Sequence, residues 1–280
     1  MPEELRISYC PRRDDENMSI LTEAAIREKM KLATLMDDPF AMEFFRDNIP
    51  CTQKMLRVIM DRDDLVVRNV KVQYVMKAAD DSRYVRLDIY AVDSDNRHYD
   101  VEIQVGPEGA LPQRARYNSA MIDVNILKTG ENYSVLKERE SIVIFITERD
   151  VLGEDEPIYV IDRVIKKSGK PFNDGSHIVY VNASHQDLTT ALGRLMHDFH
   201  CVKPEEMTDS VFARKAREMK GDEEMGVWKE IEAEIESRAE ARTSESIAQN
   251  FIKMGTIALD EIAKACGLTL QRVQELAAGK

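Results

Sequence analysis

Residues 83–105, with the sequence RYVRLDIYAVDSDNRHYDVEIQV, decide the fold. Apolar and polar residues alternate over 84–92 and again over 97–105, which predicts two β-strands that each bury one face. The cluster DSDN at 93–96 is typical of a turn, because Asp, Asn and Ser side chains bond to the nearby backbone. The stretch therefore predicts an antiparallel hairpin, in which residues whose numbers sum to about 190 lie opposite each other.

Two carboxylates meet on one face of this hairpin. Strand alternation places Arg86, Asp88 and Tyr90 on one face of the first strand, and Glu102 with Gln104 on one face of the second. The expected register puts Asp88 beside Glu102. Like charges in that position destabilise a sheet by up to about 1 kcal/mol, which a bound cation would offset. Oxygen ligands select Mg²⁺ or Mn²⁺, although edge strands also carry solvated acids without any metal.

The segments around the hairpin predict an α/β fold. Residues 65–76, LVVRNVKVQYVM, have the alternation of a further strand. Helices are expected from the apolar spacing within 20–61 and over 111–128 and 187–199, and strands over 141–147, 158–165 and 177–181. Helices first, then three strands, a helix and more strands is the order of a mixed sheet flanked by helices.

Composition limits the class of protein. The chain has 280 residues, of which 43% are hydrophobic, enough for a packed core. Its formal net charge of -12 excludes a basic coat for nucleic acid but leaves room for a local basic groove. The four cysteines are far apart, which favours neither a disulfide framework nor a zinc ribbon. Without a signal-like or membrane-length apolar run, a cytoplasmic protein with no membrane association is expected.

The chain divides into four expected parts. Residues 1–19 form a polar lead-in and residues 20–203 the α/β core. Residues 204–246 are expected to form exposed acidic helices, because 205–245 hold 13 acids and 7 bases around a thin apolar stripe. Residues 247–280 have the spacing of a helix-turn-helix with Gly267 at the turn, which would direct Thr269, Gln271, Arg272 and Gln274 towards a DNA groove. A helical hairpin used for packing or dimerisation fits the same pattern equally well.

Three runs around the hairpin carry a further signal: VRLDIY at 85–90, YDVEIQ at 99–104 and LPQRARY at 111–117. Together they resemble the PD-(D/E)XK nuclease family transposases, the Rpn-like (recombination-promoting nuclease) group. The later stretches IFIT at 144–147, FNDG at 172–175 and ALGRLMHDF at 191–199 are similar to the same group. The similarity covers roughly residues 36–201, so it is far more specific than an isolated pair of acids.

The resemblance implies a restriction-endonuclease-like core and a metal-dependent DNA endonuclease. The family motif is an Asp on one strand and (Asp/Glu)-x-Lys on the next. Asp88 and Glu102 match the two acids, which implies that they hold Mg²⁺ (or Mn²⁺). Gln104 stands where the general family has lysine, as in the Rpn-like branch, and would position the attacking water. Gln cannot stabilise a developing negative charge as a lysine does.

Further implications concern substrate and partners. The expected substrate is DNA, cut to 3′-hydroxyl and 5′-phosphate ends in connection with mobile elements or recombination. Arg86, Arg114 and Arg116 are candidate phosphate contacts, with ion pairs or solubility as equally good explanations. An acid of the first core helix, Asp38 or Glu43, is a further candidate. Self-association is left open. The alternative function is a catalytically degenerate nuclease fold that acts as a DNA-binding or protein-interaction module.

A zinc site is a weaker candidate. Within HDFHC at 197–201, the two histidines and the cysteine would lie on one face of a helix. No fourth ligand follows at a convincing spacing, so helix packing or capping is the favoured interpretation.

Overall fold

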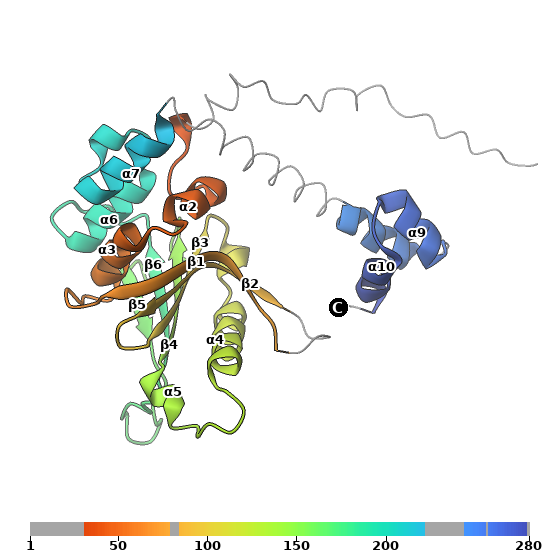
Figure 1. Ribbon diagram of the computed structural model, residues 1–280, viewed down its shortest axis with the longest axis horizontal. Helices are drawn as coiled ribbons and strands as arrows, with labels where there is room; N and C mark the ends of the chain where they lie inside the picture. Colours follow the sequence, from red (N-terminus) through yellow and green to blue (C-terminus); the bar gives the residue numbers. More distant parts are fainter. Residues whose placement is uncertain (1–30, 79–83, 222–243, 256, 279–280) are drawn as a thin grey trace, which may run out of the picture.

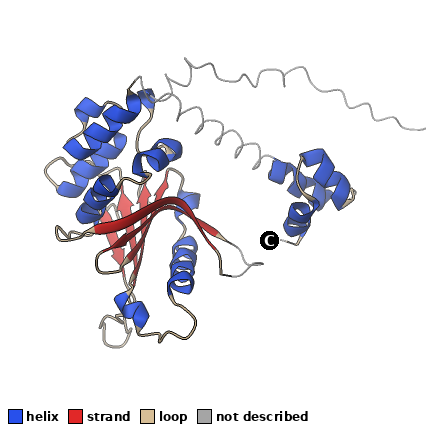
Figure 2. Cartoon of the chain, in the orientation of Figure 1, coloured by secondary structure: helices blue, strands red, loops and turns tan. Residues whose placement is uncertain are grey.

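The computed structural model describes residues 31–78, 84–221, 244–255 and 257–278 (Figure 1). A six-stranded sheet with the order β1-β2-β3-β4-β6-β5 forms its centre (Figure 2). The strands are β1 (Val67–Met76), β2 (Val85–Asp93), β3 (His98–Gln104), β4 (Ser141–Thr147), β5 (Ile158–Ile161) and β6 (Ser176–Asn182). Helices of the same region are α2 (Asp38–Phe45), α3 (Ile49–Ile59), α4 (Pro112–Ile126), α5 (Val135–Glu138), α6 (Ala191–His200) and α7 (Ser210–Lys220), with 3-10 turns η2 (Pro107–Ala110) and η3 (Pro204–Glu206).

The sheet is mixed, which confirms the predicted α/β class. β1, β2 and β3 pair antiparallel, β3, β4 and β6 pair parallel, and β5 closes the far edge antiparallel to β6. The hairpin register is the predicted one, because Ile89 pairs with Val101 and Tyr90 with Asp100. Asp88 and Glu102 are the next residues in this register.

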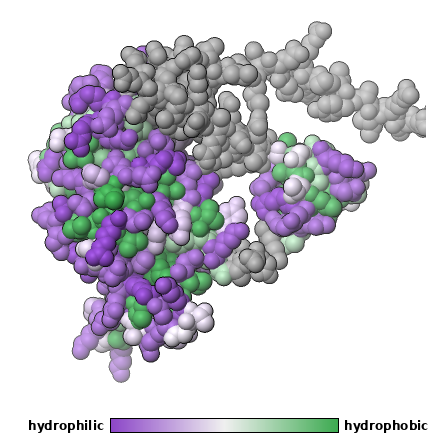
Figure 3. Space-filling model, in the orientation of Figure 1, coloured by the Kyte–Doolittle hydropathy of each residue, from purple (hydrophilic) through white to green (hydrophobic). Residues whose placement is uncertain are grey.

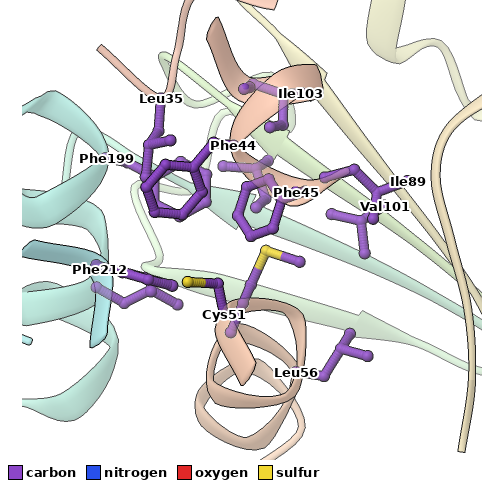
Figure 4. Close-up of a cluster of buried hydrophobic side chains, with 14 of the residues drawn as sticks. Leu35, Phe44, Phe45, Cys51, Leu56, Ile89, Val101, Ile103, Phe199 and Phe212 are labelled. Atoms are coloured by element: carbon purple, nitrogen blue, oxygen red, sulfur yellow. The ribbon is translucent and has the colours of Figure 1, made fainter. Parts of the chain in front are cut away.

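One face of the sheet is covered by α2, α3, α6 and α7 (Figure 1). Fully buried phenylalanines fill this layer, with Phe44, Phe45, Phe199 and Phe212 converging from three helices (Figure 4). Phe44 and Phe212 meet edge to face with ring centroids 5.5 Å apart. Burying each such side chain contributes roughly 1.5–3 kcal/mol, so this layer anchors the N-terminal helices to the sheet.

The opposite face is covered by α4, which begins at Pro112 directly after η2. Its buried residues Ala115, Met121 and Ile122 pack with Phe145 and Tyr180 of the sheet. Pro at the first position suits a helix start because its fixed φ is already helical and its missing N–H has no partner to lose. The short η2 turn joins the end of β3 at Gln104 to the start of α4. The first turn of α4 therefore lies close to the end of β3.

α7 belongs to the core, which differs from the expected boundary at residue 204. Phe212, Ala216 and Met219 are buried in the same layer as α2 and α3. The carboxylate of Asp198 accepts the backbone N–H groups of Thr208 (2.6 Å) and Asp209 (2.9 Å), which ties α6 to the start of α7. The lead-in at 1–19 and the acidic stretch at 222–243 lie outside the described residues.

The C-terminal residues form a helical unit with its own small core. Residues 244–254 are helical and pack with α9 (Leu259–Cys266) and α10 (Leu270–Ala277) around Ile262 and Val273. Gly267 takes φ 65° at the turn, a conformation that glycine adopts without strain. Arg272 is ion-paired with Glu245 and Glu275, so the predicted base contact is occupied within the unit. Among the described helices, none combines the length and apolar character that crossing a membrane requires.

Candidate active site

The two acids and the glutamine predicted from the sequence come together at the end of the β2–β3 hairpin. Gln104 Nε2 lies 3.5 Å from Asp88 Oδ2 and 3.4 Å from Glu102 Oε2. These distances are long for hydrogen bonds, so the amide bridges the two carboxylates loosely. The juxtaposition arises because antiparallel pairing sets Asp88 beside Glu102, and alternation returns Gln104 to the same face.

Asp88 and Gln104 line a cleft between α2, the β1–β2 hairpin and α4. Asp38, at the start of α2, lines the same cleft, and its charge raises the pKa of Asp88. Glu43 instead pairs with Arg46 at 2.7 Å. Of the two acids on the first helix, the structure therefore brings Asp38 to the site.

Two further residues lie directly behind Glu102. Asp100 and Glu102 are both 0% exposed, and Asn118 of α4 donates its amide to Asp100 Oδ2 (2.9 Å) and Glu102 Oε1 (3.2 Å). Sequence reasoning did not identify either Asp100 or Asn118. Alternation alone places Asp100 on the face of Glu102 and Gln104, but nothing in the sequence indicates which helix residue meets it.

Arg114 holds Glu102 from the first turn of α4. Its guanidinium pairs with Glu102 Oε2, donates to the carbonyl of Gly109 at 3.0 Å, and lies 5.8 Å from the ring centroid of Phe145. Arg114 was predicted as a phosphate contact, with an ion pair as the alternative, and here it is ion-paired. Arg86 lines the cleft with it, whereas Arg116 is exposed on α4 and is not among the lining residues.

Gly109 leaves the space that the Gln104 side chain fills. A Cβ added at this position would lie well under 3.0 Å from the Oε1 and Cδ atoms of Gln104. Gly106, in the same loop, has nothing within 4 Å of such an atom. The η2 turn thus shapes the site at two points, because Gly109 accommodates Gln104 and its carbonyl accepts from Arg114.

The carboxylates of the site hold protons more tightly than ordinary acids. Burial, followed by the charges of Glu102 and Asp38, raises the pKa of Asp88 well above its usual value. Burial and the neighbouring Asp100 raise the pKa of Glu102 to about 8, and burial raises that of Asp100 to about 7. Arg114 opposes these shifts but does not outweigh burial. Clustered oxygen donors whose ionised forms repel one another fit a hard divalent cation.

The predicted histidine–cysteine group lies elsewhere and is explained by packing. Ligand atoms of His197, Asp198 and Cys201 lie within 4.8 Å of one another. The carboxylate of Asp198, however, caps the start of α7, and His197 Nε2 lies 3.2 Å from the carbonyl of Glu206. His200 Nδ1 lies 2.8 Å from the carbonyl of Met196. The contacts of Asp198 and His197 hold η3 and α7 against α6, and that of His200 lies within α6, so this group is part of the scaffold.

The mixed six-stranded sheet flanked by helices is consistent with the restriction-endonuclease-like α/β fold. The model of the PD-(D/E)XK nuclease family transposases matches residues 46–192, which is more than half of the chain, and the protein belongs to this family. No curated protein and no solved structure matched the chain. Family membership indicates a nuclease-type activity linked to mobile elements, a DNA substrate and the divalent metal ions that such nucleases generally use.

Proposed function

We propose that the protein is a metal-dependent DNA endonuclease that hydrolyses phosphodiester bonds in mobile-element or recombination processes. The convergence of Asp88, Glu102 and Gln104, of which Asp88 and Gln104 line the cleft, carries this proposal. Asp88 and Glu102 would hold Mg²⁺ or Mn²⁺, with Asp38 as a further oxygen donor. A divalent ion held there would polarise the scissile phosphate and lower the pKa of an attacking water.

Gln104 orients the water in this proposal. Its amide NH2 donates towards both carboxylates, and the carbonyl Oε1, which lies beside Gly109, would accept a hydrogen bond from the attacking water. The water oxygen attacks phosphorus, the bond from phosphorus to the 3′ oxygen breaks, and a proton ends on that oxygen. The products are a 3′-hydroxyl and a 5′-phosphate. Arg86, in the same cleft, contacts the phosphate backbone.

A second candidate is a nuclease fold that binds DNA or protein without cutting. The observation that favours it is the neutral Gln104, together with the Arg114–Glu102 ion pair that already neutralises one metal ligand. This candidate predicts no metal binding at the hairpin and no dependence of function on Asp88.

Cleavage of supercoiled plasmid separates the two candidates. We would incubate the purified protein at low salt with Mg²⁺, Mn²⁺ or EDTA, beside Asp88→Ala, Glu102→Ala and the control Glu43→Gln. The endonuclease proposal expects metal-dependent nicking that both alanine variants lose and the control keeps. If the wild-type protein is folded but does not cut the plasmid with either metal ion, the result would support the binding module. DNA as substrate also leads us to propose a cytoplasmic location.

A further inference from the structure

A nuclease with a net charge of -12 must overcome repulsion from DNA. Lys77 and Arg86 line the cleft beside Arg114, but Arg114 is paired with Glu102, and the acids Asp37, Asp38 and Asp88 line the same cleft. Phosphate contacts supply most of the affinity of a protein for DNA. Because the acids of the cleft offset its cations, cations outside the cleft would add to the affinity for the proposed substrate.

One exposed hairpin supplies such cations. Residues 160–173 carry a net charge of +3, against -12 for the whole chain, and all of them are exposed. Lys166, Lys167 and Lys170 lie within five residues at the tip of this hairpin, KKSGK. The other charged residues of the stretch are already paired, Arg163 with Asp174 and Asp162 with His177. None of the three lysines has an acidic partner among the described residues.

The hairpin is well ordered by its own backbone. Val164 bridges Pro171, the N–H of Ile165 donates to the carbonyl of Lys170 (2.9 Å), and that of Phe172 donates to the carbonyl of Arg163 (2.9 Å). Gly169 supplies the left-handed turn residue at φ 68°. The lysines are thus presented from a fixed turn, which lowers the entropy lost when they bind a ligand.

The position of the hairpin sets the length of DNA that can touch it. Gln104 pairs with Thr147, and Thr147 with Asn182, so the site lies level with the end of β6, whereas the hairpin joins the start of β6 at Ser176. Six residues of strand span roughly 20 Å, and four residues from Val164 to the tip add about 13 Å. The hairpin therefore lies at the lower end of the sheet in Figure 1, roughly 30 Å from the site, or about nine base pairs of DNA.

We propose that the 160–173 hairpin is a second DNA contact, which binds the phosphate backbone about one helical turn from the cut through Lys166, Lys167 and Lys170. The inference rests on the proposed function and adds where the substrate is held. The contact is independent of sequence, because lysines at a hairpin tip meet phosphates as point charges. It requires duplex on at least one side of the scissile bond.

The test measures DNA binding by the full-length protein in EDTA, so that no cleavage interferes. The variant is K166Q/K167Q/K170Q, and the control is R214Q/R217Q, which removes exposed charges from α7. Two probes are used, a duplex of about 30 base pairs and a stem-loop of about six, which is too short to reach from the cleft to the hairpin. Exposed apolar groups such as Phe172, 59% exposed, accompany the lysines, so anionic phosphatidylglycerol vesicles form a third arm.

We expect the triple variant to bind the long duplex at least about tenfold more weakly, with a salt slope lower by about 2–3, and the stem-loop as tightly as wild type. The control should match wild type on both probes. Unchanged long-duplex binding overturns the inference, as does an equal loss on the stem-loop or a loss confined to vesicles. If wild type cuts plasmid in any of these cases, the proposed function stands without the hairpin. If it neither cuts nor binds DNA, both proposals fall.

Discussion

Replacing Gly109 with alanine should impair catalysis while leaving the fold intact. The new Cβ would overlap the Gln104 amide, which must then move by about 1 Å or more. Gly109 has no positive φ, so alanine fits its backbone, and the obstructed atoms are the free end of a flexible side chain. The stability cost should therefore stay below about 1 kcal/mol.

The expected catalytic loss follows from this displacement. Misplacing a catalytic group by about 1 Å costs on the order of a hundredfold in rate, or about 2.7 kcal/mol of transition-state stabilisation. The amide's contacts of 3.4 and 3.5 Å to the carboxylates are already long, so a further shift removes them. We therefore expect the kcat of plasmid nicking to fall roughly a hundredfold, with little change in KM.

Two comparisons make the experiment decisive. Gly106→Ala adds the same methyl group to the same loop but meets no atom within 4 Å, so it should leave kcat unchanged. In a Gln104→Ala background the overlap disappears, so Gly109→Ala should then cost almost nothing. Thermal unfolding would be measured for every variant. If Gly109→Ala were as active as Gly106→Ala, or if its effect persisted fully without Gln104, the reasoning about the amide would be refuted.

Three other perturbations test the site and the core. Asp38→Asn should weaken Mg²⁺ binding, measured by calorimetry, several-fold or more, whereas Glu43→Gln should leave it unchanged. Equal Mg²⁺ affinities of the two variants would show that Asp38 is not a metal ligand. Phe212→Ala should lower the free energy of unfolding by about 3–5 kcal/mol in urea titrations, and a loss below about 1 kcal/mol would place α7 outside the core. Because burial raises the pKa of Glu102 from 4.5 to about 8, the folded state binds more protons than the unfolded state between these values. The metal-free protein should therefore lose stability as pH rises from about 5 to 8, by up to about 1.4 kcal/mol per pH unit for this group; Glu102→Gln should flatten that decline, and parallel wild-type and variant curves would contradict the assignment.

The hairpin and its acid pair were predictable because they depend on local rules. Alternation fixes which side chains share a face, and a turn of known position fixes the register, so the pairing of Ile89 with Val101 was predictable from the sequence. The contacts of Arg114, Asn118 and Gly109 were not. They depend on where α4 and η2 come to rest over β3, which is decided by long-range packing against Phe145 and its neighbours.

α7 shows how an average over a segment conceals a core helix. The excess of acids over 205–245 favoured exposed helices, yet Phe212, Ala216 and Met219 recur at helical spacing and are buried. The acids that dominate the count lie mostly in 222–243, outside the described residues. Averaging charge and hydrophobicity over the length of a single helix, rather than over all of 205–245, would have separated the buried α7 from the acidic residues that follow it.

The neutral Gln104 and the position of Arg114 belong together. Where the general family motif places a lysine on β3, this chain has an amide, and the cation beside Glu102 comes instead from the first turn of α4. A guanidinium remains charged at every relevant pH and presents several donors, so it can leave Glu102 for a phosphate oxygen once another cation neutralises the carboxylate. The side chain is anchored to the Gly109 carbonyl and rests against Phe145, and both contacts keep it at the cleft whichever partner it holds. We therefore propose that α4 supplies the positive charge that the motif lacks on the strand, which would make the substitution at Gln104 compatible with nuclease activity.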